Sequence, residues 1–275
     1  MNPSFRFALL GRNVSYSKSP DIFTAIAQIA GITINFELIS VEPADFVPSV
    51  NRLRDSGCNG FALTIPYKEA ILESLDSLDA IAAKTGSVNC VMLDNLKLRG
   101  YNTDFYGFFL GLEPAREHLK SGPALVLGTG GAARTVIQAL CTLPSVTDIT
   151  VAGRSIRKIE PLLSETDRRI EFCQYPQLSP LTKPGYSLIV NATPLGGWNA
   201  PDRLPLPESF PFSPELIYYD LNYNADNKMV RLAQERGAVA IDGSRMLVAQ
   251  ALKSFLIWTG HEIPLPPIFE NVFGG

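Results

Sequence analysis

The sequence predicts an α/β protein of two domains, and three observations lead to this prediction. Apolar, strand-like runs alternate with amphipathic, helix-like runs along the chain. A glycine-rich turn, GTGGAAR, opens a second series of the same kind near the middle of the chain. The 275 residues are 46% hydrophobic, which is enough to form two cores of ordinary size. We therefore expect a mostly parallel N-terminal α/β domain followed by a Rossmann-like domain.

The first hundred residues are predicted to form a βαβαβ arrangement followed by a hairpin. Gly31 follows a helical apolar pattern and is typical of a helix end. Pro48 is expected to disturb the second helix, and Asp94-Asn95 indicates the hairpin turn. The predicted strands are residues 5–11, 34–41, 60–65, 87–93 and 96–102, and the predicted helices are 17–30, 43–57 and 68–86.

A polar, proline-punctuated stretch at residues 112–123 predicts the junction between the domains there or slightly earlier. Residues 199–214 contain too many prolines for a regular element and are predicted to form a loop. In the second series the predicted strands are 124–128, 148–153, 170–175, 186–193, 216–222 and 238–243. The predicted helices are 132–142, one starting at 156, 227–236 and 246–259.

Composition narrows the possible functions. The formal net charge of −3 gives no general attraction to nucleic acid, and neither a signal peptide nor a bilayer-spanning run is visible. The spacing of the cysteines suits neither zinc nor a disulfide framework, so we expect reduced thiols and a cytoplasmic location. Histidine is scarce, so Lys, Asp or Tyr must be considered for proton chemistry. The cysteines are Cys58, Cys90, Cys141 and Cys173, and the histidines are His118 and His261.

The glycine-rich turn predicts a dinucleotide site. Gly128 permits a tight turn after an apolar strand, and Gly130 lets the backbone approach a pyrophosphate. A helix begins after Gly130, and the N–H groups of its first residues would face the anion. The alternative is a tight strand-to-helix connection that binds nothing.

The end of the next strand indicates which dinucleotide is bound. An NAD site usually carries an acidic residue there, whereas this strand runs into Gly153, Arg154, Ser155, Arg157 and Lys158. Cations at this position favour a 2′-phosphate, and hence NADP. An ordinary basic helix start is the alternative, although the helix dipole disfavours cations there.

Lys68 and Asp104 are the candidate acid/base pair. Each follows a predicted strand, and the carboxyl ends of parallel strands meet at the edge where ligands bind. Ser17 and Ser19 follow the first strand and are expected at the same edge. The alternatives are a solvated surface lysine, a helix-capping Asp104 and a capping serine pair. Gln250 can likewise be a polar residue on a packed helix.

Seven motifs in order resemble the shikimate dehydrogenase family over nearly the whole chain. They are SYSKSP (15–20), LTIPYK (63–68), TGSVNC (85–90), GYNTDFYGF (100–108), GTGGAAR (128–134), NATPLG (191–196) and DGSRMLVAQ (242–250).

The resemblance implies reversible, NADP-dependent reduction of 3-dehydroshikimate to shikimate in aromatic amino-acid and chorismate biosynthesis. It implies a substrate-binding and catalytic domain at 1–105, an NADP-binding Rossmann domain at 106–244, and a C-terminal helix segment, 245–275, packing back on the first domain. Lys68 and Asp104 are then catalytic. The implied substrate-binding residues are Ser17, Ser19, Thr64, Asn89, Asp104, Tyr223 and Gln250. The implied cofactor-binding residues are Gly128, Thr129, Gly130, Gly131, Ala132, Gly153, Arg154, Ser155, Arg157, Lys158, Leu221 and Gly243.

The chain departs from the family pattern at several positions. Ala62 stands where the family has Asn, and Tyr16 replaces a frequent His. Arg245 replaces a glycine near the C-terminus and is expected close to the nicotinamide or the substrate. In the GRS segment, Gly153 replaces the family's Asn. These departures bear on substrate preference more than on the type of reaction.

Three other functions are considered. A quinate/shikimate dehydrogenase using NAD is disfavoured because no acidic residue stands beside Arg154. A folate-type methylene dehydrogenase fits the paired serines and Asp104 less well. A non-catalytic NADP-binding sensor would be expected to lose Lys68 or Asp104. We expect a small-molecule substrate, no metal, nucleic acid or membrane partner, a chain complete by itself, and a monomer or homodimer.

Overall fold

The computed structural model describes residues 3–163, 166–175 and 185–274. Its chain divides into two compact units, which are described separately. Unit 1 comprises Met1–Gly107 and Val248–Gly275, and unit 2 comprises Phe108–Leu247. The C-terminal segment therefore belongs to the same unit as the N-terminus, and the predicted two-domain α/β class is confirmed.

Unit 1 is built on a six-stranded sheet in the order β2-β1-β3-β5-β6-β4. Strand β1 pairs in parallel with β2 and β3, and β4 pairs in parallel with β6. Strand β5 runs antiparallel to both β3 and β6, so β3 and β6 point the same way. The strands are β1 (Ser4–Gly11), β2 (Thr33–Ser40), β3 (Gly60–Leu63), β4 (Ser77–Leu78), β5 (Cys90–Asp94) and β6 (Lys97–Tyr101).

The first two α-helices of unit 1 follow their local signals closely. Pro20 lies in the first turn of α1, and Gly31 ends that helix at φ 64° in the left-handed conformation. Pro48 lies within the first turn of α2, where a proline is tolerated, and does not interrupt the helix. The helices wholly within unit 1 are α1 (Ser19–Ala30), η1 (Pro43–Asp45), α2 (Phe46–Asp55), α3 (Tyr67–Ala70), η2 (Ile71–Ser74), α4 (Ala80–Thr85) and α11 (Leu265–Phe273), and the chain passes from one unit to the other within α5 (Asp104–Leu112) and within α10 (Ser244–Thr259).

The single helix predicted at 68–86 is wrong, because the segment forms α3, η2, β4 and α4 instead. The backbone N–H of Asp76 donates to the Leu98 carbonyl at 2.9 Å, and its carboxylate accepts from the Leu98 N–H at 2.7 Å. The Asp79 carboxylate then caps α4 by accepting from the Ala82 N–H at 2.6 Å. Pairing with β6 thus overrides the helical pattern of the sequence.

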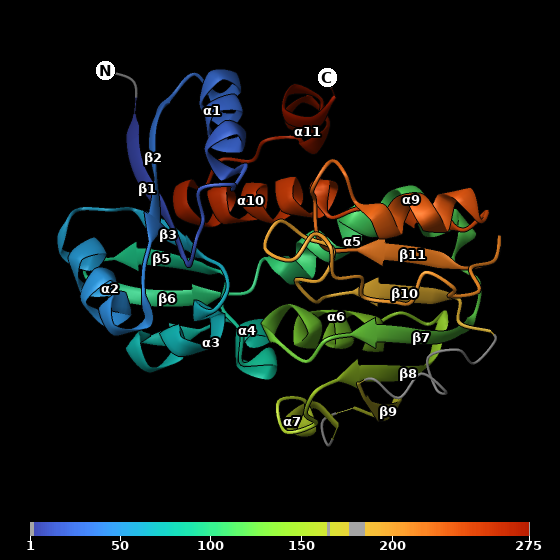
Figure 1. The fold of residues 1–275 in the computed structure, drawn as a ribbon. Coiled ribbons are helices and arrows are strands. Elements are labelled where there is room, and N and C mark those ends of the chain that lie inside the picture. Colours follow the sequence, from blue (N-terminus) through green and yellow to red (C-terminus); the bar gives the residue numbers. More distant parts are fainter. Residues whose placement is uncertain (1–2, 164–165, 176–184, 275) are drawn as a thin grey trace. The chain divides into compact units, whose positions relative to one another are not determined.

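No element is predicted after residue 259, yet α11 follows. Its prolines stand in the first turn, where their missing N–H groups cost nothing. In Figure 1, α11 lies beside α1, and contacts between the two helices agree with this view. A short helix that depends on packing gives little signal in the sequence.

Unit 2 contains a wholly parallel six-stranded sheet in the order β12-β11-β10-β7-β8-β9. The strand order reverses between β7 and β10, and the carboxyl ends at such a reversal are where open α/β sheets bind ligands (Figure 1). The elements are η3 (Glu113–His118), β7 (Gly122–Leu127), α6 (Gly131–Cys141), β8 (Val146–Gly153), α7 (Glu160–Leu163), β9 (Arg169–Gln174), β10 (Leu188–Asn191), β11 (Ile217–Asp220), α9 (Lys228–Glu235) and β12 (Val239–Ile241).

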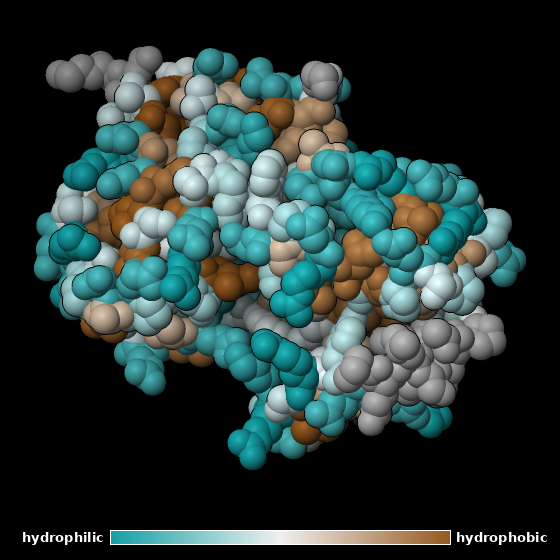
Figure 2. Space-filling view, in the orientation of Figure 1, coloured by the Kyte–Doolittle hydropathy of each residue, from teal (hydrophilic) through white to brown (hydrophobic). Residues whose placement is uncertain are grey.

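On the face shown in Figure 2, hydrophilic residues predominate and apolar residues form separate patches. Each unit carries one tryptophan: Trp198 in unit 2 is 51% exposed and Trp258 in unit 1 is 8% exposed.

Across the described ranges 3–163, 166–175 and 185–274, no helix is both long and apolar enough to cross a bilayer. Nor do three or more His, Cys, Asp or Glu side chains among these residues gather as metal ligands.

The packing of Trp258 against β3 leads to a first prediction. The indole N–H donates to the Val91 carbonyl at 2.9 Å, and a Cβ on Gly60 would lie 2.3 Å from the indole nitrogen. Gly60→Ala is therefore expected to lower the free energy of unfolding by about 1–3 kcal/mol through overpacking. A urea titration followed by circular dichroism measures this change. Gly130→Ala is the matched control, since a Cβ there meets nothing within 4 Å; equal losses would contradict the prediction.

Candidate active site

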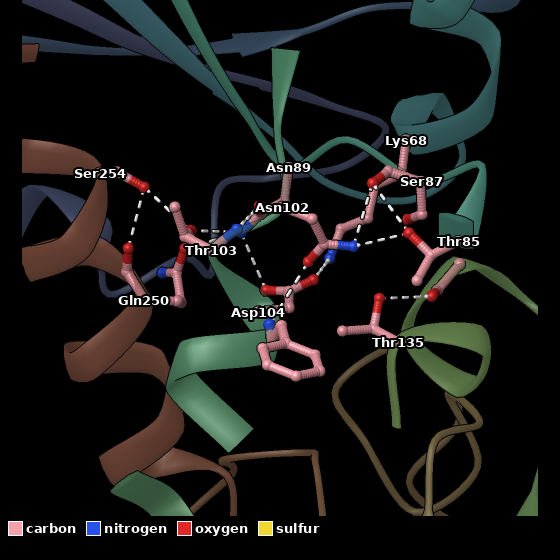
Figure 3. A network of polar contacts seen from close by, with 12 residues as sticks. Lys68, Thr85, Ser87, Asn89, Asn102, Thr103, Asp104, Thr135, Gln250 and Ser254 are labelled. Carbon is pink, nitrogen blue, oxygen red and sulfur yellow. Dashed lines mark hydrogen bonds and ion pairs between the residues drawn. The ribbon is translucent and has the colours of Figure 1, made fainter. Parts of the chain in front are cut away.

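The site in unit 1 is centred on an ion pair between Lys68 and Asp104. Lys68 Nζ lies 2.5 Å from Asp104 Oδ2, and the two side chains are 17% and 7% exposed. Lys68 lies on α3, directly after β3, and Asp104 is the first residue of α5, after β6. Because β3 and β6 point the same way, their carboxyl ends bring the two residues to one edge of the sheet. Figure 3 shows the side chains directed at each other.

Asn89 binds the other oxygen of the same carboxylate. Its Nδ2 donates to Asp104 Oδ1 at 2.9 Å, so each oxygen of Asp104 has a donor. Asn89 immediately precedes β5, and the start of this antiparallel strand lies at the edge where β3 and β6 end. The lysine–aspartate pair is thus held by a third, neutral side chain.

A chain of hydroxyl groups orients the Asn89 amide. The Thr103 N–H donates to Asn89 Oδ1 at 2.7 Å, and Asn89 Nδ2 lies 2.8 Å from Thr103 Oγ1. Ser254 Oγ lies 3.0 Å from Thr103 Oγ1 and donates to the Gln250 carbonyl at 2.8 Å. A hydroxyl has one proton, and Ser254 Oγ donates its proton to the Gln250 carbonyl. Ser254 Oγ therefore accepts a hydrogen bond from the Thr103 hydroxyl. Thr103 Oγ1 is then left to accept from Asn89.

Gln250 reaches the same amide from α10. Its Oε1 accepts from Asn89 Nδ2 at 3.1 Å, so the predicted residues Lys68, Asn89, Asp104 and Gln250 form one connected network (Figure 3). Sequence reasoning missed Thr103 and Ser254. A signal for Ser254 was present, because residues four apart on a helix share a face and Ser254 follows Gln250 by four.

The alternative in which Asp104 merely caps α5 does not fit the structure. Asn102 serves as the capping residue, because its Oδ1 accepts from the Phe105 N–H at 3.3 Å. The Asn102 amide is in turn fixed by Thr85 Oγ1 at 3.1 Å and the Ser87 carbonyl at 3.0 Å. The Asp104 carboxylate is consequently available to Lys68.

The remaining predicted residues of unit 1 lie at the same edge. Ser17 Oγ donates to Ser19 Oγ at 3.1 Å and accepts from the Ser19 N–H at 3.2 Å, in the turn between β1 and α1. Thr64 directly follows β3, and its N–H donates to the Leu10 carbonyl at 3.0 Å. Ala62 lies within β3 between Leu9 and Cys90 and is partly exposed.

Unit 2 carries the glycine turn at the carboxyl end of β7. Gly128 has φ 113°, which favours glycine, and a Cβ on Gly130 would project into open space. Helix α6 begins at Gly131 with no acidic residue in its first turn, and its first N–H groups have no partner within the helix. Thr129 and Ala132 complete the turn. These features fit an anionic pyrophosphate.

The basic segment follows the neighbouring strand β8. Gly153 ends that strand against Thr129, since a Cβ on Gly153 would lie 2.4 Å from Thr129 Cγ2. The segment is exposed and precedes α7, which begins at Glu160 rather than at 156 as predicted. The exposed residues are Arg154, Ser155, Arg157 and Lys158.

Three other predicted residues lie beyond β11. Leu221 directly follows β11, and its carbonyl would lie 2.2 Å from a Cβ on Gly243, so these two segments are in close contact. Tyr223, also in unit 2, is two residues further on. The substituted Arg245 is tied into unit 2, where its Nε donates to the Leu110 carbonyl at 2.9 Å.

Comparison with known proteins adds a family match and full-length relatives. Residues 9–91 match the model of the shikimate dehydrogenase substrate binding domain. A shikimate dehydrogenase (NADP(+)) of Pelodictyon phaeoclathratiforme is 34% identical over 96% of this chain and 95% of its own. One of Chlorobium chlorochromatii is also 34% identical, over 99% of this chain and 98% of its own.

A solved structure extends the similarity to the whole fold. Shikimate 5-dehydrogenase of Thermus thermophilus, solved with NADP(H) and shikimate, is 31% identical and covers 98% of both chains with a TM-score of 0.83.

The hydroxyl chain behind Asn89 yields a second prediction. Thr103→Val and Ser254→Ala are each expected to lower the free energy of unfolding by about 1–2 kcal/mol, because each removes a buried hydrogen bond. The double variant should lose clearly less free energy of unfolding than the two single variants lose together, since both changes break the same hydrogen bond. Urea titrations of the three variants measure the coupling.

Thr259→Ala is the matched control for this cycle. Thr259 donates to the Phe255 carbonyl at 2.8 Å on the same helix, as Ser254 does to Gln250. Combined with Thr103→Val it should show simple additivity. Additivity in the Thr103/Ser254 pair as well would contradict the hydrogen bond between these two hydroxyl groups.

Proposed function

Because the chain belongs to the shikimate dehydrogenase family, we propose that it is an NADP-dependent shikimate dehydrogenase. It interconverts 3-dehydroshikimate and shikimate in the route to chorismate and the aromatic amino acids. The observation that carries the proposal is the Lys68–Asp104 ion pair at the carboxyl edge of the unit 1 sheet. An ammonium group so placed can protonate the oxygen of a ring ketone as that ketone is reduced.

Lys68 is proposed to move the proton. When bound, NADPH supplies the hydride that reduces the carbonyl carbon. As the carbonyl π pair moves onto oxygen, that oxygen takes a proton from Lys68 Nζ, which becomes a neutral amine. In the oxidation direction the neutral amine accepts the hydroxyl proton. The ammonium has three N–H bonds and Asp104 occupies one, so two remain for substrate and water.

Asp104 and Asn89 are proposed to hold Lys68 in place. With one oxygen on the lysine and the other on the Asn89 amide, the carboxylate fixes Nζ while the lysine chain is partly buried. Asn89, Gln250 and Thr64 offer further polar groups to the ring hydroxyls. Ser17 and Ser19 are proposed to bind the substrate carboxylate, and Tyr223 is proposed as a further substrate-binding residue.

The cofactor is proposed to bind at the glycine turn of unit 2. The N–H groups at Gly131 and Ala132 would hold the pyrophosphate, and Arg154, Arg157 and Lys158 the 2′-phosphate. The exposed cations beside the turn and the open space at Gly130 support this assignment. Leu221 and Gly243 are proposed to border the nicotinamide end.

We further infer that residues 1–105 form the substrate-binding and catalytic domain and that residues 106–244 form the NADP-binding domain. Residues 245–275 are inferred to be a C-terminal helix segment that packs back on the substrate-binding domain. The enzyme is proposed to act in the cytoplasm as a monomer or homodimer. The four cysteines form no disulfide with one another, which suits a reducing compartment.

The catalytic proposal is tested by removing either member of the pair. Lys68→Ala and Asp104→Asn are expected to lower kcat by about 100-fold or more, the usual size of a general acid's contribution. NADPH binding, measured by titration of the cofactor's fluorescence, should stay near normal. The exposed Lys84→Ala is the control. Near-full turnover by Lys68→Ala would overturn the assigned role.

The cofactor proposal is tested by reversing one charge. Arg154→Asp is expected to weaken NADPH binding by about 10–100-fold, because a charged hydrogen bond to phosphate is lost, while NADH binding changes much less. Steady-state kinetics with both cofactors and with shikimate or quinate give the comparison. Arg116→Asp is the control, because Arg116 is an exposed residue of unit 2 and the substitution changes the charge by the same amount. Equal losses for NADPH and NADH would contradict the assignment.

A further inference from the structure

We propose that Asp220 is a positioning residue for cofactor binding, because it fixes the loop at residues 192–197 against the glycine turn. This inference rests on the proposed NADP-binding function of unit 2. Asp220 is fully buried at the end of β11, where it is 0% exposed. It was not among the residues predicted to form a site.

The Asp220 carboxylate is surrounded by donors. Asn191 Nδ2 lies 3.0 Å from both of its oxygens, and the Tyr218 hydroxyl donates to Oδ2 at 2.8 Å. The backbone N–H and the Nδ2 of Asn222 both donate to Oδ1, at 3.0 and 2.8 Å. Burial raises the pKa of Asp220, although these hydrogen bonds oppose the rise. With donors at both oxygens, the carboxyl group acts as an acceptor only.

This acceptor sets the orientation of two amides. An ionised carboxylate accepts but does not donate, so Asn191 and Asn222 must both turn their NH₂ groups toward Asp220. Asn191 Oδ1 is thereby left to accept from the Thr193 N–H at 3.1 Å and from the Thr193 hydroxyl at 2.7 Å. A neutral amide at position 220 would satisfy either orientation of its neighbours.

The two oriented amides hold the carbonyl groups of the loop. Asn191 Nδ2 donates to the Leu195 carbonyl at 3.0 Å. Asn222 Nδ2 donates to the Thr193 and Leu195 carbonyls at 3.1 and 3.2 Å. Thr193 Oγ1 accepts from the Leu195 N–H at 3.2 Å, so the loop is bound at both its N–H and its carbonyl groups.

The loop forms one side of the glycine turn. A Cβ on Gly128 would lie 3.2 Å from both the Ala192 carbonyl and Thr193 Cγ2. The Ala192 N–H donates to the carbonyl of Leu127, the last residue of β7, at 2.9 Å. A displacement of the 192–197 loop would therefore change the space at the turn where the pyrophosphate is proposed to bind.

The inference is tested by measuring NADPH binding with Asp220→Asn and with the milder Asn222→Ala. Each is expected to raise the Kd for NADPH by about tenfold, similar to the effect of losing one charged hydrogen bond. Hydrogen exchange in the absence of cofactor should quicken at the Thr193 and Leu195 amides. Asn227→Ala is the matched control: it removes the Val230 N–H cap of α9, a 3.2 Å bond, without touching the loop.

The outcomes separate the inference from the function on which it rests. If the unaltered chain does not bind NADPH, the proposed function fails. If it binds NADPH and both variants bind equally well, with normal exchange at residues 193 and 195, the positioning role is wrong. If Asn227→Ala weakens binding as much as Asn222→Ala at an equal loss of thermal stability, general destabilisation explains the effect and the inference is again overturned.

Discussion

The buried carboxylate of Asp104 is the constraint around which unit 1 is arranged. A negative charge on a side chain that is 7% exposed needs donors at both oxygens, and the structure supplies Lys68 for one and Asn89 for the other. Those donors come from different elements, so the strands β3, β5 and β6 must keep their register for the charge to be satisfied. The hydroxyl chain from Thr103 to Ser254 extends this requirement into α10, far along the sequence.

Both units concentrate polar side chains at the ends of parallel strands, and both secure them with amides. In unit 1 one amide, Asn89, binds a carboxylate that also holds a cation. In unit 2 two amides, Asn191 and Asn222, bind the carboxylate of Asp220. The groups that donate hydrogen bonds to this carboxylate are neutral. The first arrangement leaves the Lys68 ammonium partly exposed. The second leaves backbone carbonyls fixed in a loop and serves geometry alone.

The sequence predicted most strands and the main helices along the chain because strong local signals agreed with the fold. Gly31, the Asp94-Asn95 turn and the glycine turn all appear where their residue types require. The helix predicted at 68–86 failed because Asp76 pairs with β6, through a partner 22 residues away. Ser254 and Asp220 were not predicted for a related reason: the contact that joins each to its polar network comes from a distant residue, Thr103 for Ser254 and Asn191 for Asp220.

The distribution of the two tryptophans has a spectroscopic consequence. Trp258 is packed between Phe7, Phe23 and the β3 backbone in unit 1, whereas Trp198 stands in an exposed loop of unit 2. A buried indole emits at shorter wavelength than a hydrated one, so the two signals are separable without labels. Replacing Trp198 with Phe leaves a single intrinsic fluorophore of this kind, inside the unit that holds Lys68. Its emission then follows the unfolding of that unit by itself.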